Sequence, residues 1–123
     1  MEAVLRLLHV GLIIADMVKA AAFYEGILGL KPDTRPHLGF EGLFYDLGEG
    51  QQLHLMCIAN PYEGYSQPEH GGRDRHVALA VKDLSAIRQR LDKHKIIYTM
   101  SKSGRAALFC HDADGNAIEL CEV

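Results

Sequence analysis

Two stretches of this sequence present the same order of residue types. His9 lies near the start of an apolar run that ends at Asp16, and His76 lies near the start of another that ends at Asp83. The two histidines are 67 residues apart, and so are the two aspartates. A period of this length that occurs only twice is typical of a pseudo-symmetric domain rather than of a repeat array. We therefore predict two copies of one structural unit.

A further matched pair lies toward the end of each unit. His54 and Glu119 are 65 residues apart, and both stand in short apolar stretches that are typical of strands. Glu119 is flanked by Ile118 and Leu120, and a carboxylate buried among such neighbours must be paired, protonated or bound to a metal. Together with His9 and His76, these residues provide three imidazoles and one carboxylate. That set suits a divalent transition metal such as Zn, Ni, Fe, Co or Mn.

Composition excludes several classes of protein. The chain has 123 residues, the length of one domain, and its net charge of −3 gives no reason to expect nucleic acid or an anionic membrane as a partner. The longest apolar run, residues 7–15, is too short to span a bilayer. Cys57, Cys110 and Cys121 lack metal-binding spacing, so we expect small buried side chains, a reducing compartment and a cytoplasmic protein.

Local patterns predict the plan βαβββ–βαβββ. Each helix is expected to begin at an aspartate cap, Asp16 or Asp83, and the first is expected to end near residue 28 before Gly29. Prolines limit the segment after it to an edge strand. The expected strands are 5–15, 42–46, 51–58, 76–81, 96–100, 105–111 and 116–123. We divide the single domain, residues 1–123, into a first unit at about 5–58, a connector at 59–74 and a second unit at about 75–123.

Two motifs give the chain a family resemblance over essentially its whole length. Phe23-Tyr24-Glu25-Gly26-Ile27-Leu28-Gly29 is similar to the FYxxxLG motif of the vicinal oxygen chelate superfamily. The run from Asp112 to Leu120, DADGNAIEL, is similar to DPDGNxxEL. The superfamily contains glyoxalase I (lactoylglutathione lyase), bleomycin resistance proteins and extradiol dioxygenases. The resemblance implies an α+β fold in which two tandem βαβββ units form a pseudo-two-fold cupped mixed sheet, the glyoxalase-like fold. It also implies a homodimer.

The same resemblance assigns roles to the matched residues. It implies that His9, His54, His76 and Glu119 hold the metal. It also implies that Glu119 acts as a base, after partial release from the metal, when an enediolate forms from a small vicinal-oxygen substrate such as a 2-oxoaldehyde. The chain is thus expected to be a metal-dependent, glyoxalase-like lyase or isomerase.

Three positions depart from the pattern of glyoxalase I. His54 stands where that enzyme usually has glutamate, which leaves a site with one carboxylate and a formal charge of +1 around a divalent metal. Ile13 and Ile58 stand where it has the arginine and the asparagine that hold glutathione. Isoleucine cannot bind a charged group, so these residues argue against a glutathione substrate.

Two other functions remain open. His9, His76 and Glu119 alone form the two-histidine, one-carboxylate set of Fe(II) dioxygenases. A small-molecule binding or resistance module without catalysis is the third possibility, and such modules typically lack the metal set.

Three arginines are candidates for binding substrate. Arg73 and Arg75 lie just before the strand of His76, and Arg105 begins a later strand. A guanidinium at the mouth of a site could bind a substrate carboxylate. A solvated charge cluster is the alternative.

Overall fold

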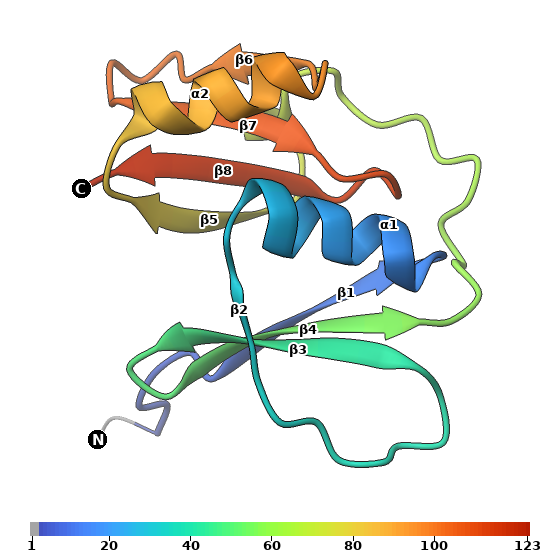
Figure 1. The fold of residues 1–123 in the computed structure, drawn as a ribbon. Helices are drawn as coiled ribbons and strands as arrows, with labels where there is room; N and C mark the ends of the chain where they lie inside the picture. Colours follow the sequence, from blue (N-terminus) through green and yellow to red (C-terminus); the bar gives the residue numbers. More distant parts are fainter. Residues whose placement is uncertain (1–2) are drawn as a thin grey trace. The chain divides into compact units, whose positions relative to one another are not determined.

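The computed structural model describes residues 3–123 and is α+β, as predicted (Figure 1). Residues 1 and 2, which belong to the predicted domain, lie outside this range. The described chain divides into two compact units, the first ending at Ala59 and the second running from Asn60 to Val123. Each unit is a four-stranded mixed sheet with a helical segment between its first and second strands.

The first unit has the strand order β1-β4-β3-β2. β1 (His9–Ile14) is parallel to β4 (Gln51–Cys57), whereas β3 (Gly42–Gly48) is antiparallel to both β4 and β2 (Lys31–Pro32). β2 lies at the sheet edge, where the missing N–H of Pro32 interrupts no ladder. The expected hairpin is formed by β3 and β4. The edge strand expected after the first helix is confirmed as β2.

The second unit repeats this arrangement with the order β5-β8-β7-β6. β5 (His76–Val81) is parallel to β8 (Ala117–Glu122), and β7 (Ala107–His111) is antiparallel to β8 and to β6 (Tyr98–Met100). Order and direction match those of the first unit strand by strand. The predicted duplication of a βαβββ unit is confirmed.

Both predicted helix caps are confirmed. The side chain of Asp16 accepts a hydrogen bond from the backbone N–H of Lys19 at the start of α1 (Met17–Ala21), and Asp83 accepts one from Ala86 in α2 (Leu84–Lys93). Such caps satisfy backbone donors that have no partner within the helix.

The first helix changes its winding inside the FYEGILG motif. After α1 the chain forms the π-helix η1 (Ala22–Ile27), with a hydrogen bond from the N–H of Leu28 to the carbonyl of Phe23. The helical segment ends before Gly29, which has a φ of 72°. Phe23, Tyr24 and Ile27 are all buried. The helix thus has the predicted extent, but its π geometry was not predicted.

Three strands begin two or more residues later than expected, close to the ends of their partner strands. The first was expected from Leu5 but begins at His9, which pairs with Gln52 near the start of β4. Leu5 has no partner strand and is 85% exposed. In the same way β6 begins at residue 98 and β7 at 107. The connector contains a 3-10 turn, η2 (Gly71–Arg73), that was not expected.

Alternation along the strands separates a packed face from a face that carries the candidate ligands. In β4, Leu53 and Leu55 are fully buried, while His54 between them is only half-buried. Tyr45 of β3 is also fully buried and stacks on Tyr24 of η1. In the second unit Leu91 of α2 is fully buried, as are the β-strand residues Leu108, Cys110, Ile118 and Leu120.

The cysteine prediction is correct for one residue of three. Cys110 is buried, but Cys57 and Cys121 are partly exposed because they lie near strand ends; all three are free thiols. Burial raises the pKa of the Cys110 thiol to about 12, with a smaller contribution from Asp112.

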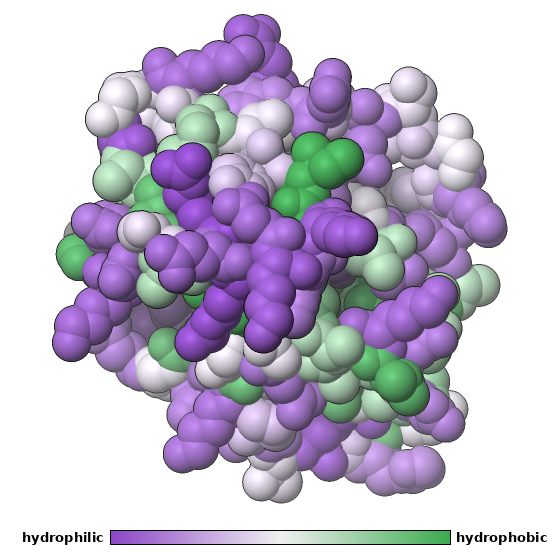
Figure 2. Space-filling view, turned by 45° about the horizontal axis from the view of Figure 1, so that its top comes forward, coloured by the Kyte–Doolittle hydropathy of each residue, from purple (hydrophilic) through white to green (hydrophobic). Residues whose placement is uncertain are grey.

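No helix within residues 3–123 is long and apolar enough to cross a membrane. Figure 2 shows hydrophilic residues over most of the surface that faces the viewer, with smaller groups of hydrophobic residues between them.

Tyr45→Phe tests the buried hydrogen bond that links β3 to η1. The Tyr45 hydroxyl donates to a carboxylate oxygen of Glu25 at 2.9 Å, and burial, followed by this carboxylate, raises the pKa of Tyr45. We expect the free energy of unfolding, measured with urea, to fall by about 1 to 2 kcal/mol. Tyr98→Phe is the control, because the Tyr98 hydroxyl only accepts an exposed bond from Arg88 and its loss should cost less than about 0.5 kcal/mol. Equal effects of the two substitutions would contradict this account.

Thiol alkylation tests the placement of the cysteines. The thiolate is the reactive form, so at pH 8 Cys110 should stay unmodified in the folded protein while Cys57 and Cys121 react with iodoacetamide. Peptide mapping by mass spectrometry before and after unfolding measures this difference. If Cys110 in the folded protein were modified as fast as Cys121, Cys110 would not be buried in β7 as described.

Candidate metal centre

In the second unit, parallel pairing brings His76 and Glu119 together. His76 pairs with Ala117 and Ala78 pairs with Glu119, so the two side chains occupy neighbouring positions on one face of the sheet. The Nε2 atom of His76 lies 3.2 Å from Oε1 of Glu119, and Glu119 is only 3% exposed. The buried carboxylate therefore has the partner that its apolar flanks require.

The other nitrogen of His76 is already engaged. Nδ1 lies 2.8 Å from the backbone oxygen of Asp74. A carbonyl oxygen can only accept, so Nδ1 carries a proton, and Nε2, which faces the Glu119 carboxylate, is the nitrogen that can take a proton or a metal. A ligating histidine typically has this arrangement, with one nitrogen anchored and the other free for a metal.

The distance between the pair also fits a shared metal. Two ligands at ordinary zinc distances and at angles between octahedral and tetrahedral are about 3.0 to 3.4 Å apart. The 3.2 Å between Nε2 of His76 and Oε1 of Glu119 falls in this range. The same distance suits an ion pair with a protonated imidazole, so the pair is suited to either a proton or a metal.

Arg105 binds the second oxygen of the carboxylate. Its Nη2 atom lies 3.0 Å from Oε2 of Glu119, and its side chain is 63% exposed. The arginine extends from the loop between β6 and β7, where its backbone N–H donates to the hydroxyl of Ser103. Oε1 of Glu119 is thus directed to His76 and Oε2 to Arg105. Arg105 was predicted from the sequence as a candidate for binding substrate, but its ion pair with Glu119 was not predicted.

In the first unit the equivalent strands bring His9 and His54 together. His9 pairs with Gln52 and Gly11 with His54, the same offset as in the second unit. The two imidazoles stack with their centroids 4.0 Å apart and their planes at 18°. The structure thus brings the two predicted ligands of the first unit into contact.

The environment of His54 favours its neutral form. Burial lowers the pKa of His54 below its ordinary value, and the charges of His9 and Arg35 lower it further. The neutral imidazole is the form that binds metals. Nε2 of His54 lies 2.8 Å from the side-chain oxygen of Gln52.

Each pair also has a phenylalanine that the sequence analysis missed. Phe44 of β3 pairs with His54 and stacks on it at 3.6 Å, with the planes at 1°. Phe109 of β7 pairs with Glu119 and meets the His76 ring edge-on at 5.2 Å. These phenylalanines are 65 residues apart, the same spacing as His54 and Glu119, so the repeat carried the signal.

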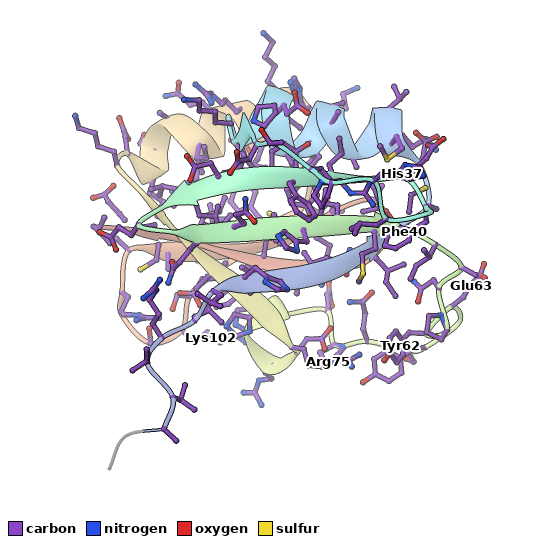
Figure 3. All side chains as sticks on the ribbon, turned by 90° about the horizontal axis from the view of Figure 1, so that it is seen from below. His37, Phe40, Tyr62, Glu63, Arg75 and Lys102 are labelled. Atoms are coloured by element: carbon purple, nitrogen blue, oxygen red, sulfur yellow. The ribbon has the colours of Figure 1, made fainter. Side chains whose placement is uncertain are left out.

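The other arginines named from the sequence lie elsewhere in the second unit. Arg75 stacks over the rings of Tyr62 and Tyr65, with its guanidinium carbon 5.1 Å and 5.9 Å from their centroids, and Figure 3 shows Arg75 beside Tyr62. Arg73 is an exposed residue of η2. Among the interactions that the structure shows within residues 3–123, Arg105 is the one of these three arginines that contacts a candidate ligand.

The two isoleucines keep apolar surroundings near the first pair. Ile13 is on the same face of β1 as His9 and pairs with Met56, and Ile58 follows β4 and is 40% exposed. Neither places a charged group beside the imidazoles.

A cavity of about 430 Å³ lies at the β6 edge of the second unit, lined by Gln67, Pro68, Glu69, Lys95, Ile96, Ile97, Tyr98, Thr99, Phe109 and His111. Phe109, which lines the cavity, also contacts the His76 ring, and Nδ1 of His70 is bonded to the Thr99 hydroxyl at 2.6 Å beside the Phe109 ring. Phe109 fits closely under the connector, because a Cβ on Gly71 would lie 3.1 Å from the Cβ of Phe109. Neither His76 nor Glu119 is among the residues that line this cavity.

The donors of each pair are of residue types that bind transition metals. Within residues 3–123 no group of three or more histidine, cysteine, aspartate or glutamate side chains stands ready to hold a metal. Each unit instead offers two: two imidazoles in the first, and an imidazole with a carboxylate in the second.

Comparison with known proteins identifies the family. The family model described as Glyoxalase/Bleomycin resistance protein/Dioxygenase superfamily matches residues 6–120. The chain is 31% identical over 127 residues to the mitochondrial methylmalonyl-CoA epimerase of Homo sapiens, covering 94% of this chain and 72% of the epimerase. It is 28% identical over 119 residues to Glyoxylase I 4 of Arabidopsis thaliana, covering 92% of this chain and 68% of that protein.

A solved structure confirms the fold. A putative glyoxalase family protein from Bacillus anthracis superposes with a TM-score of 0.78 at 20% identity, covering 99% of this chain and 98% of that one. The glyoxalase-like fold expected from the sequence is thus confirmed. With the match over residues 6–120, the chain belongs to the glyoxalase/bleomycin resistance protein/dioxygenase superfamily.

Proposed function

We propose that this protein is a metal-dependent, glyoxalase-like lyase or isomerase that moves a proton at a carbon next to a carbonyl group. The observation that carries the proposal is the matched pairing of β1 with β4 and of β5 with β8, which sets two donor side chains side by side in each unit. A structural role alone gives no reason for donor side chains at the same register position in both repeats.

His9, His54, His76 and Glu119 would together hold one divalent transition metal, such as Zn, Ni, Fe, Co or Mn. A bound metal ion of this kind polarises a carbonyl oxygen and stabilises the negative charge of an enolate or enediolate. A site with a single carboxylate keeps a net positive charge around a divalent ion, which favours an anionic or enolate-forming substrate with two vicinal oxygens.

Glu119 is the residue suited to move the proton. Oε1 would take the proton from the substrate carbon and return it, to the same carbon or to its neighbour. Arg105 holds Oε2 at 3.0 Å, which directs Oε1 and balances the carboxylate charge. Arg105 is largely exposed and can also meet an anionic group of the substrate.

Two relatives support this class of reaction. An epimerase of methylmalonyl-CoA must remove and return a proton at a carbon that lies between carbonyl groups, and the human enzyme of that name is 31% identical to this chain. Glyoxylase I 4 is the second relative. Ile13 and Ile58 favour a small substrate without glutathione, because neither can hold a charged tripeptide.

We further propose a single domain that works as a cytoplasmic homodimer. β1 and β5 are the edge strands of their own sheets, and such edges are usually paired or covered in the assembled protein. Sedimentation equilibrium on the metal-loaded protein measures the assembly. A concentration-independent monomer would contradict the dimer.

The metal content and two substitutions test the proposed activity. The protein as purified should contain about one transition-metal ion per chain by mass spectrometry, and His76→Ala should lose it. Glu119→Gln should lower kcat for a 2-oxoaldehyde, or for a substrate with an acidic carbon beside a carbonyl, by about 10²- to 10⁴-fold. His94→Ala is the control, because His94 is an exposed residue at the end of α2 and should change neither quantity.

Other outcomes of that experiment point to the other functions. Absence of stoichiometric metal, with activity unchanged by His76→Ala, would contradict the proposal. Oxygen consumption with catechols after anaerobic loading with Fe(II) would identify a dioxygenase instead. Tight binding of a small molecule without turnover or metal would identify a binding module.

Acidification tests the ligand chemistry. Protons compete with the metal for imidazole nitrogen, so metal should be lost as pH falls through the ordinary histidine range and be regained above it. Equilibrium dialysis at a series of pH values, with the metal content of each sample, measures this. Full retention of metal below about pH 4 would exclude three histidine ligands.

A further inference from the structure

A chain of two side-chain hydrogen bonds leads from the surface to His54. Asp33, just after β2, accepts from Nε2 of Gln52 at 2.8 Å, and Oε1 of Gln52 lies 2.8 Å from Nε2 of His54. The backbone N–H of Asp33 donates to the carbonyl of Phe44 at 2.8 Å, which secures Asp33 against β3. Gln52 and His54 are two residues apart in β4 and so share a face.

The chemistry of these groups sets the direction of the hydrogen bonds. A carboxylate only accepts, so the NH₂ of Gln52 faces Asp33 and its carbonyl oxygen faces His54. That oxygen also only accepts, so Nε2 of His54 carries the proton. In the neutral imidazole the lone pair is then on Nδ1.

Aromatic packing fixes the plane of the His54 ring. Phe44 stacks at 3.6 Å and His9 at 4.0 Å on His54, with planes tilted by 1° and 18°. The ring edge that bears Nε2 is occupied by Gln52, which leaves Nδ1 on the remaining side. His76 shows the opposite arrangement, because its Nδ1 is bonded to the Asp74 oxygen and its Nε2 faces Glu119.

We propose that Gln52, supported by Asp33, is a positioning residue that keeps His54 in the Nε2–H tautomer and thereby presents Nδ1 to the metal, whereas His76 presents Nε2. This inference rests on the proposed metal site for its consequence. The tautomer itself is a property of the metal-free protein. Partners outside the ligand set typically change metal affinity 10- to 100-fold when they are removed.

The tautomer is measured in metal-free protein by long-range ¹H–¹⁵N correlation spectra of the histidine rings at a pH at which His54 is neutral. We expect the Nε2-protonated pattern for His54 and a proton on Nδ1 of His76. Gln52→Met keeps the length of the side chain but removes its acceptor, so the spectrum of His54 should shift toward a mixture of tautomers. Gln51→Met is the matched control, because Gln51 donates to the backbone oxygen of Leu7 instead.

Metal affinity gives the second readout. By competition with a chromophoric chelator, Gln52→Met should weaken Zn²⁺ binding about 10- to 100-fold, and Gln51→Met should leave it within about twofold. Urea unfolding of both variants shows whether a change in affinity merely follows a loss of folding.

A double substitution tests the direction of the chain. Asp33→Asn together with Gln52→Glu exchanges the amide and the carboxylate, so that position 33 donates, position 52 accepts from both sides, and Nε2 of His54 still donates. We expect this double variant to restore the Nε2–H tautomer and most of the affinity. The single variant Gln52→Glu places two carboxylates side by side and should recover less.

The outcomes separate this inference from the proposed function. If the unsubstituted protein binds no metal but shows the Nε2–H tautomer that Gln52→Met abolishes, the metal site fails and the positioning of His54 stands. If the protein binds metal but Gln52→Met behaves like Gln51→Met in both spectrum and affinity, this inference is overturned. A proton that remains on Nδ1 of His54 in the metal-bound protein would overturn it as well.

Discussion

The candidate site depends on one constraint, which is the register of the two parallel strand pairs. β1 against β4, and β5 against β8, each place a histidine diagonally beside the second donor on the same sheet face. A shift by one residue would turn either donor toward the packed face, where Leu53 and Leu55, or Ile118 and Leu120, now lie. The packing of these apolar residues therefore sets the positions of the donors.

The two units share this register but complete it differently. In the second unit Glu119 supplies the charge, with Arg105 on its far oxygen and the Asp74 carbonyl on the far nitrogen of His76. In the first unit both donors are imidazoles, and the support comes from aromatic stacking on Phe44 and from the Gln52–Asp33 chain. A duplicated scaffold thus places its donors alike, whereas the groups that orient them are particular to each unit. The four candidate ligands therefore have unlike environments although their strand positions are equivalent.

Much of the fold and the ligand pairs could be predicted because their signals are local or periodic. Aspartate caps, strand alternation and the 67-residue spacing are all visible in the sequence, and the structure confirms the caps and the repeat. Strand ends were less accurate, because a strand stops where its partner stops, as at His9, and apolar composition does not record that. The π-helix in FYEGILG was not predicted, because the spacing of its buried residues resembles that of an α-helix.

The orienting contacts could not be predicted for a related reason. Arg105 reaches Glu119 from a loop, and Asp33 reaches Gln52 across one strand, β3, so neither contact follows from spacing along the chain. Gln52 was visibly on the face of His54, but the direction of a hydrogen bond depends on which group lies beyond it. Phe44 and Phe109 could have been found from the repeat, because they have the same 65-residue spacing as His54 and Glu119, with which they pair.

The central claim is that the two pairs bind one ion together. X-ray absorption spectroscopy of protein loaded with Zn²⁺, with the metal-to-chain ratio determined on the same sample, tests it most directly. The account predicts one zinc per chain, with scattering from three imidazoles and from oxygen ligands that include a carboxylate. Two zinc ions per chain, or a single zinc bound by fewer than three imidazoles, would show that the pairs do not form one site.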